Sequence, residues 1–254
     1  VEDARNVEHD VGIAGVQVII LIEDSIRFYS SYLPMLYTEL VKQTQRLMSE
    51  TANRLQKLLR MRARPKLLLA TTWEEGMDLF ERYQGQVLGV ITDVAFPRGG
   101  VKDPQAGHLF AAAVKNAVPD MAVLLQSTEA SNQQRAEEAG VRFVHKRSPQ
   151  LMAEVRGFMR DSMGFGDFVF RNREGNEIAR AGNLKAMARQ IHELPVDVIL
   201  YHARHNHFST WLMARTEFSL ARAIRPRKVE EFVDAEAVRA YLHERFRNRE
   251  SLVR

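Results

Sequence analysis

A short apolar stretch that ends in an aspartate decides how the rest of the chain is interpreted. It reads Val87-Leu88-Gly89-Val90-Ile91-Thr92-Asp93-Val94-Ala95-Phe96-Pro97. The run before Asp93 is rich in β-branched residues and too short for a stable helix, so it predicts a buried strand. In an open parallel sheet, the carboxyl ends of the strands converge on one crevice. Asp93 is therefore the first residue that we expect to be functional.

The segments on either side alternate between strands and helices. Short apolar runs predict further strands at residues 16–22, 66–70, 121–126 and 141–144, and helical spacing of apolar residues is found between them. Strands and helices that alternate in this way predict an α/β fold with a doubly wound, five-stranded parallel sheet over residues 16–160. Residues 1–15 are polar and predict a tail.

The first predicted helix is unusually long. Residues 26–62 contain no glycine and carry apolar residues at helical spacing. A continuous helix of that length would reach ~55 Å, far more than a crossover between parallel strands needs. Pro34 is expected to kink this helix or to split it into two. The leucines of its distal half predict either a coiled-coil-like homodimer seam or packing on the chain's own C-terminal module.

Polar residues follow each predicted strand that leads to the crevice. Two adjacent carboxylates, Glu23 and Asp24, come directly after the first strand, where burial is costly unless a cation with oxygen ligands satisfies them. The alternative for this pair is a solvated loop that caps the next helix. The remaining strand-end residues are Asp93, Ser127, Thr128 and Lys146. Without the neighbouring carboxylates, Lys146 would be interpreted as an ordinary surface lysine.

In order, spacing and strand context, these residues resemble a bacterial response-regulator receiver domain. The resemblance implies a flavodoxin-like sheet with strand order 2-1-3-4-5. It assigns the family's acidic pair to Glu23 and Asp24, its phospho-accepting aspartate to Asp93, and the proline four residues later to Pro97. The family's hydroxyl residue falls on Ser127, or on Thr128 if the register slips by one. Its lysine falls on Lys146 and its switch aromatic on Phe143.

The chemistry of these residues agrees with that resemblance. Glu23, Asp24 and Asp93, with the backbone carbonyl of Ala95, have the oxygen ligands that Mg²⁺ prefers. The ion and Lys146 would neutralise charge while Asp93 attacks a phosphoryl group in line. The implied partner is a histidine kinase or a phosphotransfer protein of a two-component system. Such a domain catalyses only its own phosphorylation and dephosphorylation, and we find no signature of an independent catalytic domain.

Three features depart from the family pattern. The loop from Pro97 to Gly107 is longer than usual, flexible by composition, and expected to overhang the site. Lys146 is followed by Arg147 and Ser148 before a proline, and the first helix is too long. These departures leave open a second interpretation, a pseudo-receiver that serves as a dimerisation or docking scaffold because its loop blocks phosphoryl transfer.

Residues 161–254 predict a separate, mainly helical module that begins with a β-hairpin over residues 167–180. Residues 201–226 resemble a module that accompanies receiver domains in bacterial proteins with a phosphoenolpyruvate synthase or pyruvate phosphate dikinase-like phosphotransferase portion. That resemblance, and the start of the chain at Val1, imply the regulatory part of a larger protein. For His202, His205 and His207 we favour capping or packing over a metal site, because no acidic fourth ligand lies nearby.

Composition excludes several classes of protein. The 254 residues include no cysteine, which excludes disulfides and thiolate metal sites and indicates a cytoplasmic protein. No apolar run is long enough for a bilayer and no signal peptide precedes the first strand, so we expect no membrane partner. The net charge of +4 is spread among mixed charges. A DNA-binding response regulator is therefore the weakest of the three interpretations, and we expect no nucleic-acid partner.

Overall fold

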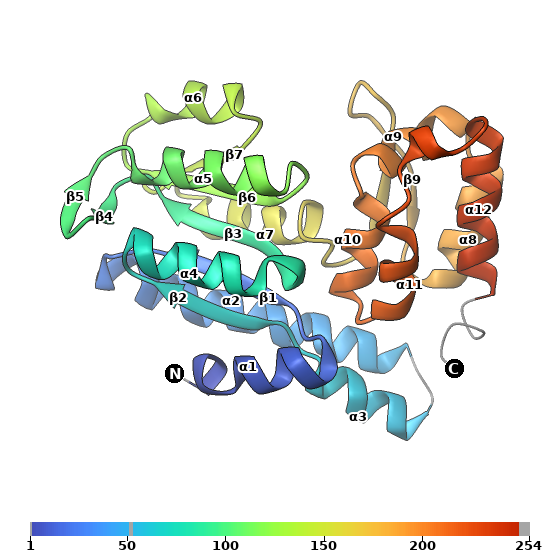
Figure 1. Ribbon diagram of the computed structural model, residues 1–254, viewed down its shortest axis with the longest axis horizontal. Helices are drawn as coiled ribbons and strands as arrows, with labels where there is room; N and C mark the ends of the chain where they lie inside the picture. Colours follow the sequence, from blue (N-terminus) through green and yellow to red (C-terminus); the bar gives the residue numbers. More distant parts are fainter. Residues whose placement is uncertain (1, 51–52, 249–254) are drawn as a thin grey trace. The chain divides into compact units, whose positions relative to one another are not determined.

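A computed structural model describes residues 2–50 and 53–248 of the chain (Figure 1). Val1, residues 51–52 of the predicted long helix and residues 249–254 of the predicted C-terminal module lie outside the described residues. The chain divides into two compact units, Val1–Ser162 and Met163–Arg254. This division lies close to the boundary expected at residues 160 and 161.

Unit 1 is built on a five-stranded parallel sheet (Figure 1). Its strands are β1 (Val18–Ile22), β2 (Lys66–Ala70), β3 (Val87–Asp93), β6 (Ala122–Ser127) and β7 (Arg142–His145), in the order β2-β1-β3-β6-β7. This is the doubly wound order of flavodoxin-like folds, so the predicted fold class is confirmed. Every residue of β1 and β3 is buried, as expected for central strands that are covered on both faces.

Helices cover both faces of this sheet. Figure 1 shows α4 (Trp73–Tyr83) and α5 (Ala106–Ala117) in front of it, and α2 (Ile26–Ser49) and α7 (Leu151–Asp161) behind it. The short η1 (Gln84–Gln86) follows α4, and α6 (Asn132–Glu138) precedes β7. Apolar side chains of α4 and α5, among them Phe80 and Phe110, pack with the strand residues Ile20 and Val90 in one core. The two-sided cover leaves the carboxyl ends of the strands as the edge where polar groups gather.

The prediction that residues 1–15 form a tail is wrong for the described residues. Glu2–Ala14 form the helix α1, in which Val7 is buried and Asp3 is only 2% exposed. The Asp3 carboxylate accepts hydrogen bonds from the backbone N–H of Leu67 at 2.9 Å and from the Arg64 guanidinium at 2.6 Å. Because β2 is an edge strand, α1 satisfies a backbone donor that the sheet itself leaves unpaired. The polar composition concealed this role.

The long helix predicted over residues 26–62 is two helices, and the division is not at Pro34. Pro34 lies inside α2, which ends at Ser49, and α3 spans Arg54–Arg62. A proline removes one helical hydrogen bond, here to the carbonyl of Ser30, but both residues are exposed, so that carbonyl faces water. Of the leucines in the distal half of the predicted helix (residues 42–62), Leu47 is buried, whereas Leu55, Leu58 and Leu59 on α3 are 64%, 43% and 56% exposed.

The segment after Pro97 is an ordered β-hairpin and not a flexible loop. The strands β4 (Phe96–Arg98) and β5 (Val101–Asp103) pair antiparallel around Gly99 and Gly100. These glycines have φ of +61° and +78°, the left-handed backbone that a tight type I′ hairpin turn requires at both central positions. The backbone N–H of Gly99 donates to Glu74 at 2.8 Å, so the hairpin is held against the start of α4.

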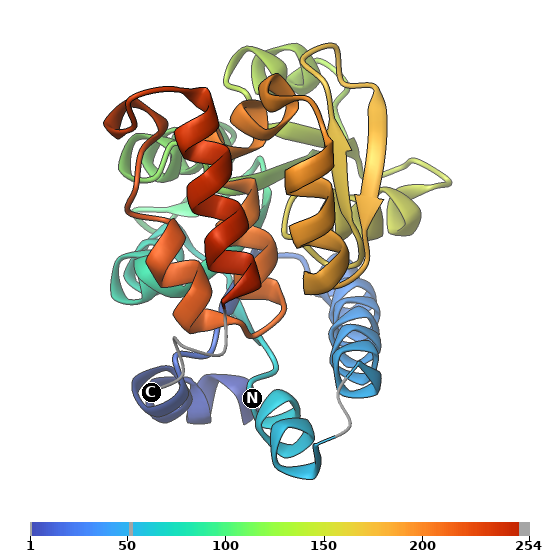
Figure 2. The same cartoon turned by 90° about the vertical axis from the view of Figure 1, so that its right-hand side faces the viewer.

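Unit 2 begins with the predicted hairpin, formed by β8 (Phe168–Arg171) and β9 (Glu177–Ala181). The helix α8 (Leu184–Glu193) packs on β9 and on α12 (Ala235–Arg247), as Figure 2 shows. The remaining elements are α9 (Val196–Arg204), α10 (His207–Ala214), α11 (Phe218–Ile224) and η2 (Val229–Glu231). The core of the unit is aromatic, with Phe168 stacked on Phe208 at 5.0 Å and in edge contact with Trp211 at 6.0 Å. No helix among the described residues combines the length and the hydropathy needed to cross a membrane.

Candidate functional site

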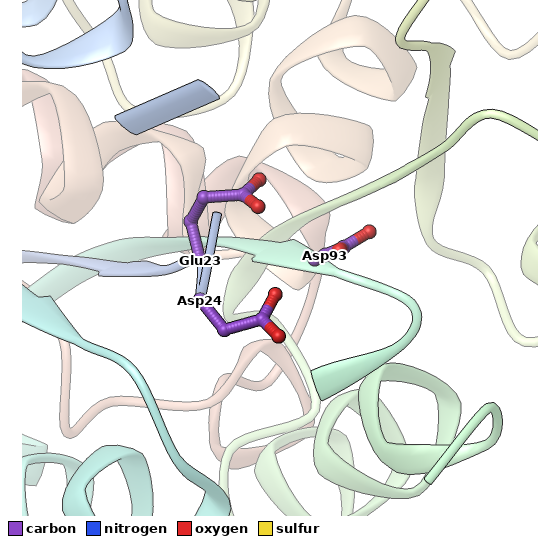
Figure 3. Close-up of side chains that lie close together, drawn as sticks. All are labelled: Glu23, Asp24 and Asp93. Atoms are coloured by element: carbon purple, nitrogen blue, oxygen red, sulfur yellow. The ribbon is translucent and has the colours of Figure 1, made fainter. Parts of the chain in front are cut away.

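The strand register brings the predicted acidic residues together at the carboxyl edge of the sheet. Ile22 of β1 pairs with Thr92 of β3, so Glu23 and Asp93 follow at neighbouring strand ends. One carboxylate oxygen from each of Glu23, Asp24 and Asp93 lies within 4.8 Å of the others (Figure 3). Within the described part of the chain, this is the one group of three or more acidic or histidine side chains placed to share a metal ion.

Lys146 joins two of these carboxylates. Its backbone N–H donates to the carbonyl of Ser127 at 2.8 Å, which continues the pairing of β6 with β7 by one residue. Its Nζ lies 2.7 Å from Oε2 of Glu23 and 2.9 Å from Oδ2 of Asp93, and the side chain is buried. The same ammonium lies 4.3 Å from the centroid of the Phe28 ring. The structure therefore places the predicted lysine inside the acidic cluster, not on the surface.

Burial governs the titration of the cluster. The pKa of Glu23 is raised to about 7, first by burial and then by the neighbouring Asp93, against the opposing effect of Lys146. Burial also raises the pKa of Asp93, although Lys146 and the backbone N–H of Val94 favour its ionised form. A raised carboxyl pKa means that the negative charge lacks compensation. The site therefore favours an additional cation.

The residues present fit a magnesium ion. Oδ1 of Asp24 is buried and has no hydrogen-bond partner among the described residues, and buried polar atoms rarely stay unsatisfied. Oδ1 of Asp93, by contrast, accepts from the backbone N–H of Val94 at 2.7 Å. The atoms that could coordinate a metal ion here are all oxygens, the ligand atoms that Mg²⁺ prefers. An unpartnered buried carboxylate oxygen beside two further carboxylates is the arrangement that a divalent cation would satisfy.

A cavity of about 310 Å³ opens over this cluster. Ser127, at the end of β6, is buried, and its Oγ accepts hydrogen bonds from Asn132 at 3.0 Å and from the backbone N–H of Glu129 at 3.1 Å. Two accepted bonds leave the hydroxyl proton of Ser127 for a further acceptor. The predicted site residues that line the cavity are Asp24, Asp93, Ala95, Ser127, Thr128 and Lys146.

Two of the predicted site residues are placed differently from the rest. Thr128 lines the cavity but is exposed, whereas Ser127 is buried, which favours Ser127 as the hydroxyl residue. Phe143 in β7 is half-buried, packs against the core of unit 1, and is not among the residues that line the cavity. Its role as a switch stays a prediction.

The sequence interpretation missed three residues of the site. Lys102 of β5 places Nζ 2.9 Å from Oδ2 of Asp24. Gln126 donates to Glu23 at 3.4 Å, and Asn132 donates to Ser127. A signal for Lys102 was present, because two glycines flanked by extended residues indicate a tight hairpin. Gln126 pairs in register with Asp93. It can be recognised as a site residue only from this strand register, which the sequence does not show.

Of the three clustered histidines of unit 2, His202 is packed in the interior. His202 is 3% exposed, and its Nε2 accepts a hydrogen bond from the backbone N–H of Arg171 at 2.8 Å. Burial lowers the pKa of His202 to about 3, so the ring is neutral. With His205 and His207 it forms no metal-binding group among the described residues. His202 is therefore a packed residue of the interior of unit 2.

No family model and no curated protein matches this chain. Among solved structures, it is similar to a response regulator receiver domain protein from Clostridium thermocellum, with 17% identity over 57% of this chain and 95% of that chain, and a TM-score of 0.39. A Mn²⁺-bound form of the response regulator Rcp1 gives 15% identity over 56% of this chain and 91% of its own, with a TM-score of 0.34. A BeF₃-activated receiver domain of DrrB gives 17% identity, 57% and 98% coverage, and a TM-score of 0.34. None of the three spans the whole chain, so the resemblance of residues 201–226 to a phosphotransferase-associated module stays a prediction.

Proposed function

We propose that unit 1 is a receiver domain that accepts a phosphoryl group on Asp93 in a Mg²⁺-dependent phosphorelay. The observation that carries the proposal is the contact of the Lys146 ammonium with Glu23 and Asp93, beside Asp24, at the floor of an open cavity. Structural ion pairs are normally closed off by side chains. Here Asp93 and Lys146 line a solvent-accessible cavity of about 310 Å³, which supports a chemical role.

In the proposed reaction, an oxygen of Asp93 forms a bond to the phosphorus of a phosphohistidine or an acyl phosphate. The bond from phosphorus to the donor's nitrogen or oxygen breaks, and the leaving group keeps the electron pair. The backbone N–H of Val94 and the Lys146 ammonium hold the two oxygens of Asp93, so the carboxylate is oriented before the donor arrives. Lys146 then neutralises charge on the transferred group, and the hydroxyl of Ser127 donates to one of its oxygens.

The residues that would hold Mg²⁺ are Glu23, Asp24 and Asp93, with the carbonyl of Ala95. When bound, the ion supplies positive charge to the phosphoryl oxygens and relieves the repulsion among the three carboxylates.

Incubation with acetyl phosphate and Mg²⁺, followed by intact-mass measurement, tests the proposal. The wild-type chain should gain the mass of one phosphoryl group, and Asp93→Asn should gain none. Asp78→Asn, an exposed aspartate on α4, is the matched control and should behave as the wild type. An unchanged mass gain in Asp93→Asn would refute the assignment.

The melting temperature supplies a second and independent measurement. Mg²⁺ should raise it in the wild type, because an ion that binds only the folded state stabilises that state. Asp24→Ala should lose most of this rise. A wild type that shows neither the rise nor the mass gain would favour the pseudo-receiver scaffold.

The proposed partners follow from this function. A histidine kinase or a phosphotransfer protein would supply the phosphoryl group, and unit 2 would act as a relay or interaction element. The resemblance of residues 201–226 makes a phosphoenolpyruvate synthase or pyruvate phosphate dikinase-like phosphotransferase the proposed attached or partner enzyme. We also propose a homodimer, now through α3 alone, because its leucines are exposed whereas Leu47 is buried.

A further inference from the structure

We infer that Lys102 is a second cationic residue of the phosphoryl site, and that it weakens Mg²⁺ binding while it strengthens binding of the phosphoryl group. The inference rests on the proposed function of Asp93. Lys102 does not lie at a carboxyl end of a sheet strand, as the other site residues do. It lies on the β4–β5 hairpin, which the expected receiver pattern does not contain.

The geometry places the two lysines on different carboxylates of one cavity. Lys102 contacts Oδ2 of Asp24 at 2.9 Å, while Lys146 contacts Glu23 and Asp93. Both lysines line the same cavity. A lysine ammonium is charged at neutral pH. A phosphoryl group on Asp93 would therefore lie in a cavity that is lined by two ammonium groups.

The hairpin holds Lys102 at a defined position. Its tip is tied to α4 by the hydrogen bond from Gly99 to Glu74 and by the Arg98 guanidinium, 4.8 Å from the centroid of the Trp73 ring. The other end of the hairpin is tied to α6, where the Arg135 guanidinium donates to Oε1 of Gln105. Because the backbone is fixed at both ends, the ammonium remains close to the site even when its contact with Asp24 opens.

The charges explain the opposite effects on the two ligands. Three carboxylates face two ammonium groups, so the site has a formal charge of −1 when all three carboxylates are ionised. Lys102 reduces the attraction of Asp24 for a divalent cation, because it already neutralises that carboxylate. A phosphoryl group on Asp93 adds negative charge, and the same ammonium then attracts it. Lysine at this position therefore shifts the site away from the metal and towards the anion.

The test uses the full chain and two probes, Mg²⁺ alone and beryllofluoride at saturating Mg²⁺, each titrated by melting temperature. Lys102→Met should bind Mg²⁺ about three- to tenfold more tightly and beryllofluoride about three- to tenfold more weakly, as expected for one partly screened charge a few ångströms away. Lys102→Arg keeps the charge and should restore both affinities towards the wild type.

Lys42→Met is the matched control. Lys42 is 63% exposed and pairs with Glu39 at 2.9 Å, whereas Lys102 is 60% exposed and pairs with Asp24 at the same distance. Both affinities of Lys42→Met should equal those of the wild type. A Lys102→Met variant that matches this control, or that loses affinity for both probes, overturns the inference and leaves the proposed function intact. A wild type that responds to neither probe overturns both.

Discussion

Gly107 allows α5 to begin directly against the strand that carries Asp93. A Cβ atom at this position would lie 2.1 Å from the carbonyl oxygen of Asp93 and 2.7 Å from Cα of Val94. Both are backbone atoms, so no side-chain rotation can relieve the clash. The backbone N–H of Gly107 also donates to the carbonyl of Val94 at 2.8 Å. The absence of a side chain at one position therefore fixes the distance between Asp93, the proposed phosphoryl-accepting residue, and its neighbouring helix.

Gly107→Ala should lower the free energy of unfolding by at least about 1–3 kcal/mol, the usual cost of overpacking. It should also reduce phosphorylation of Asp93, because the clash falls on the backbone of that residue. Chemical denaturation and intact mass measure the two effects. Gly12→Ala is the control, since Gly12 lies in a helix with nothing within 4 Å of the added atom, and it should be neutral or slightly stabilising. A stable, fully active Gly107→Ala chain would contradict this account.

A site residue can be predicted from the sequence when its position depends only on the strand that it follows. Asp93 ends a buried run, and Glu23, Ser127 and Lys146 do the same for their strands, so convergence of parallel strands is enough to collect them. Lys102 lies on a hairpin whose orientation over the sheet depends on Glu74 and Trp73. Such contacts between distant segments leave no pattern in the local sequence.

At the scale of elements, α1 depends on one buried carboxylate. Burial raises the pKa of Asp3, but hydrogen bonds from Arg64, the backbone N–H of Leu67 and Tyr37 outweigh it and hold the pKa below 3.8. A carboxyl group with a lowered pKa in the folded state stabilises the fold above its unfolded pKa, and this contribution is lost as the pH falls through the folded pKa. The contribution of Asp3 is therefore complete at neutral pH and disappears below about pH 4.

Asp3→Asn should lower the free energy of unfolding by about 2 kcal/mol at neutral pH, the scale of a hydrogen bond to a charged group. The difference from the wild type should shrink as the pH falls below about 4, and urea denaturation at several pH values measures it. Asp78→Asn breaks an exposed ion pair with Arg82 and should change stability by less than about 0.5 kcal/mol. A difference that is independent of pH would show that the ionised Asp3 does not anchor α1.

The sequence could not show that α1 is a helix that packs. Its apolar residues are few, and the polar Asp3 is buried because β2 has an unpaired edge donor at Leu67, a property of sheet order. The boundary between α2 and α3 is also difficult to predict from the sequence. The run without glycine predicts that both segments are helical, but it does not predict where α2 ends. Pro34 is expected to cause the break, but it lies inside α2, which continues to Ser49.

The exposed face of α3 predicts self-association. Leu58 and Leu59 follow Leu55 by three and four residues, and all three are more than two-fifths exposed, so they form one apolar strip on a helix. Leu55→Glu with Leu58→Glu should convert a dimer to a monomer, as measured by light scattering. Ile178→Glu alters a residue of β9 that is 45% exposed and should leave the dimer intact. A wild-type chain that is monomeric at high concentration would refute the prediction.

At the scale of the whole molecule, the distribution of charge decides whether the chain could act on DNA. The net charge is only +4, and several arginines of unit 2 pair with acids on its surface. Arg227 contacts Glu231 at 3.3 Å, and Arg239 contacts Glu236 at 3.0 Å. The large apolar residues Trp211 and Leu212 are buried. Paired arginines do not form the continuous basic face that phosphate contacts require.

We therefore expect the full chain to bind mixed-sequence duplex DNA only weakly, with an affinity that vanishes as salt rises towards physiological concentration. The affinity of a protein for DNA falls with salt roughly in proportion to the number of phosphates that it neutralises, so titration at two salt concentrations separates scattered charge from a dedicated surface. Glu231→Gln with Glu236→Gln releases Arg227 and Arg239 from their partners. This variant should strengthen binding at low salt without making it selective for any sequence, because added charge alone reads no base. Tight, sequence-selective binding by the wild type at near-physiological salt would instead establish unit 2 as a DNA-binding output and replace the relay function proposed for it.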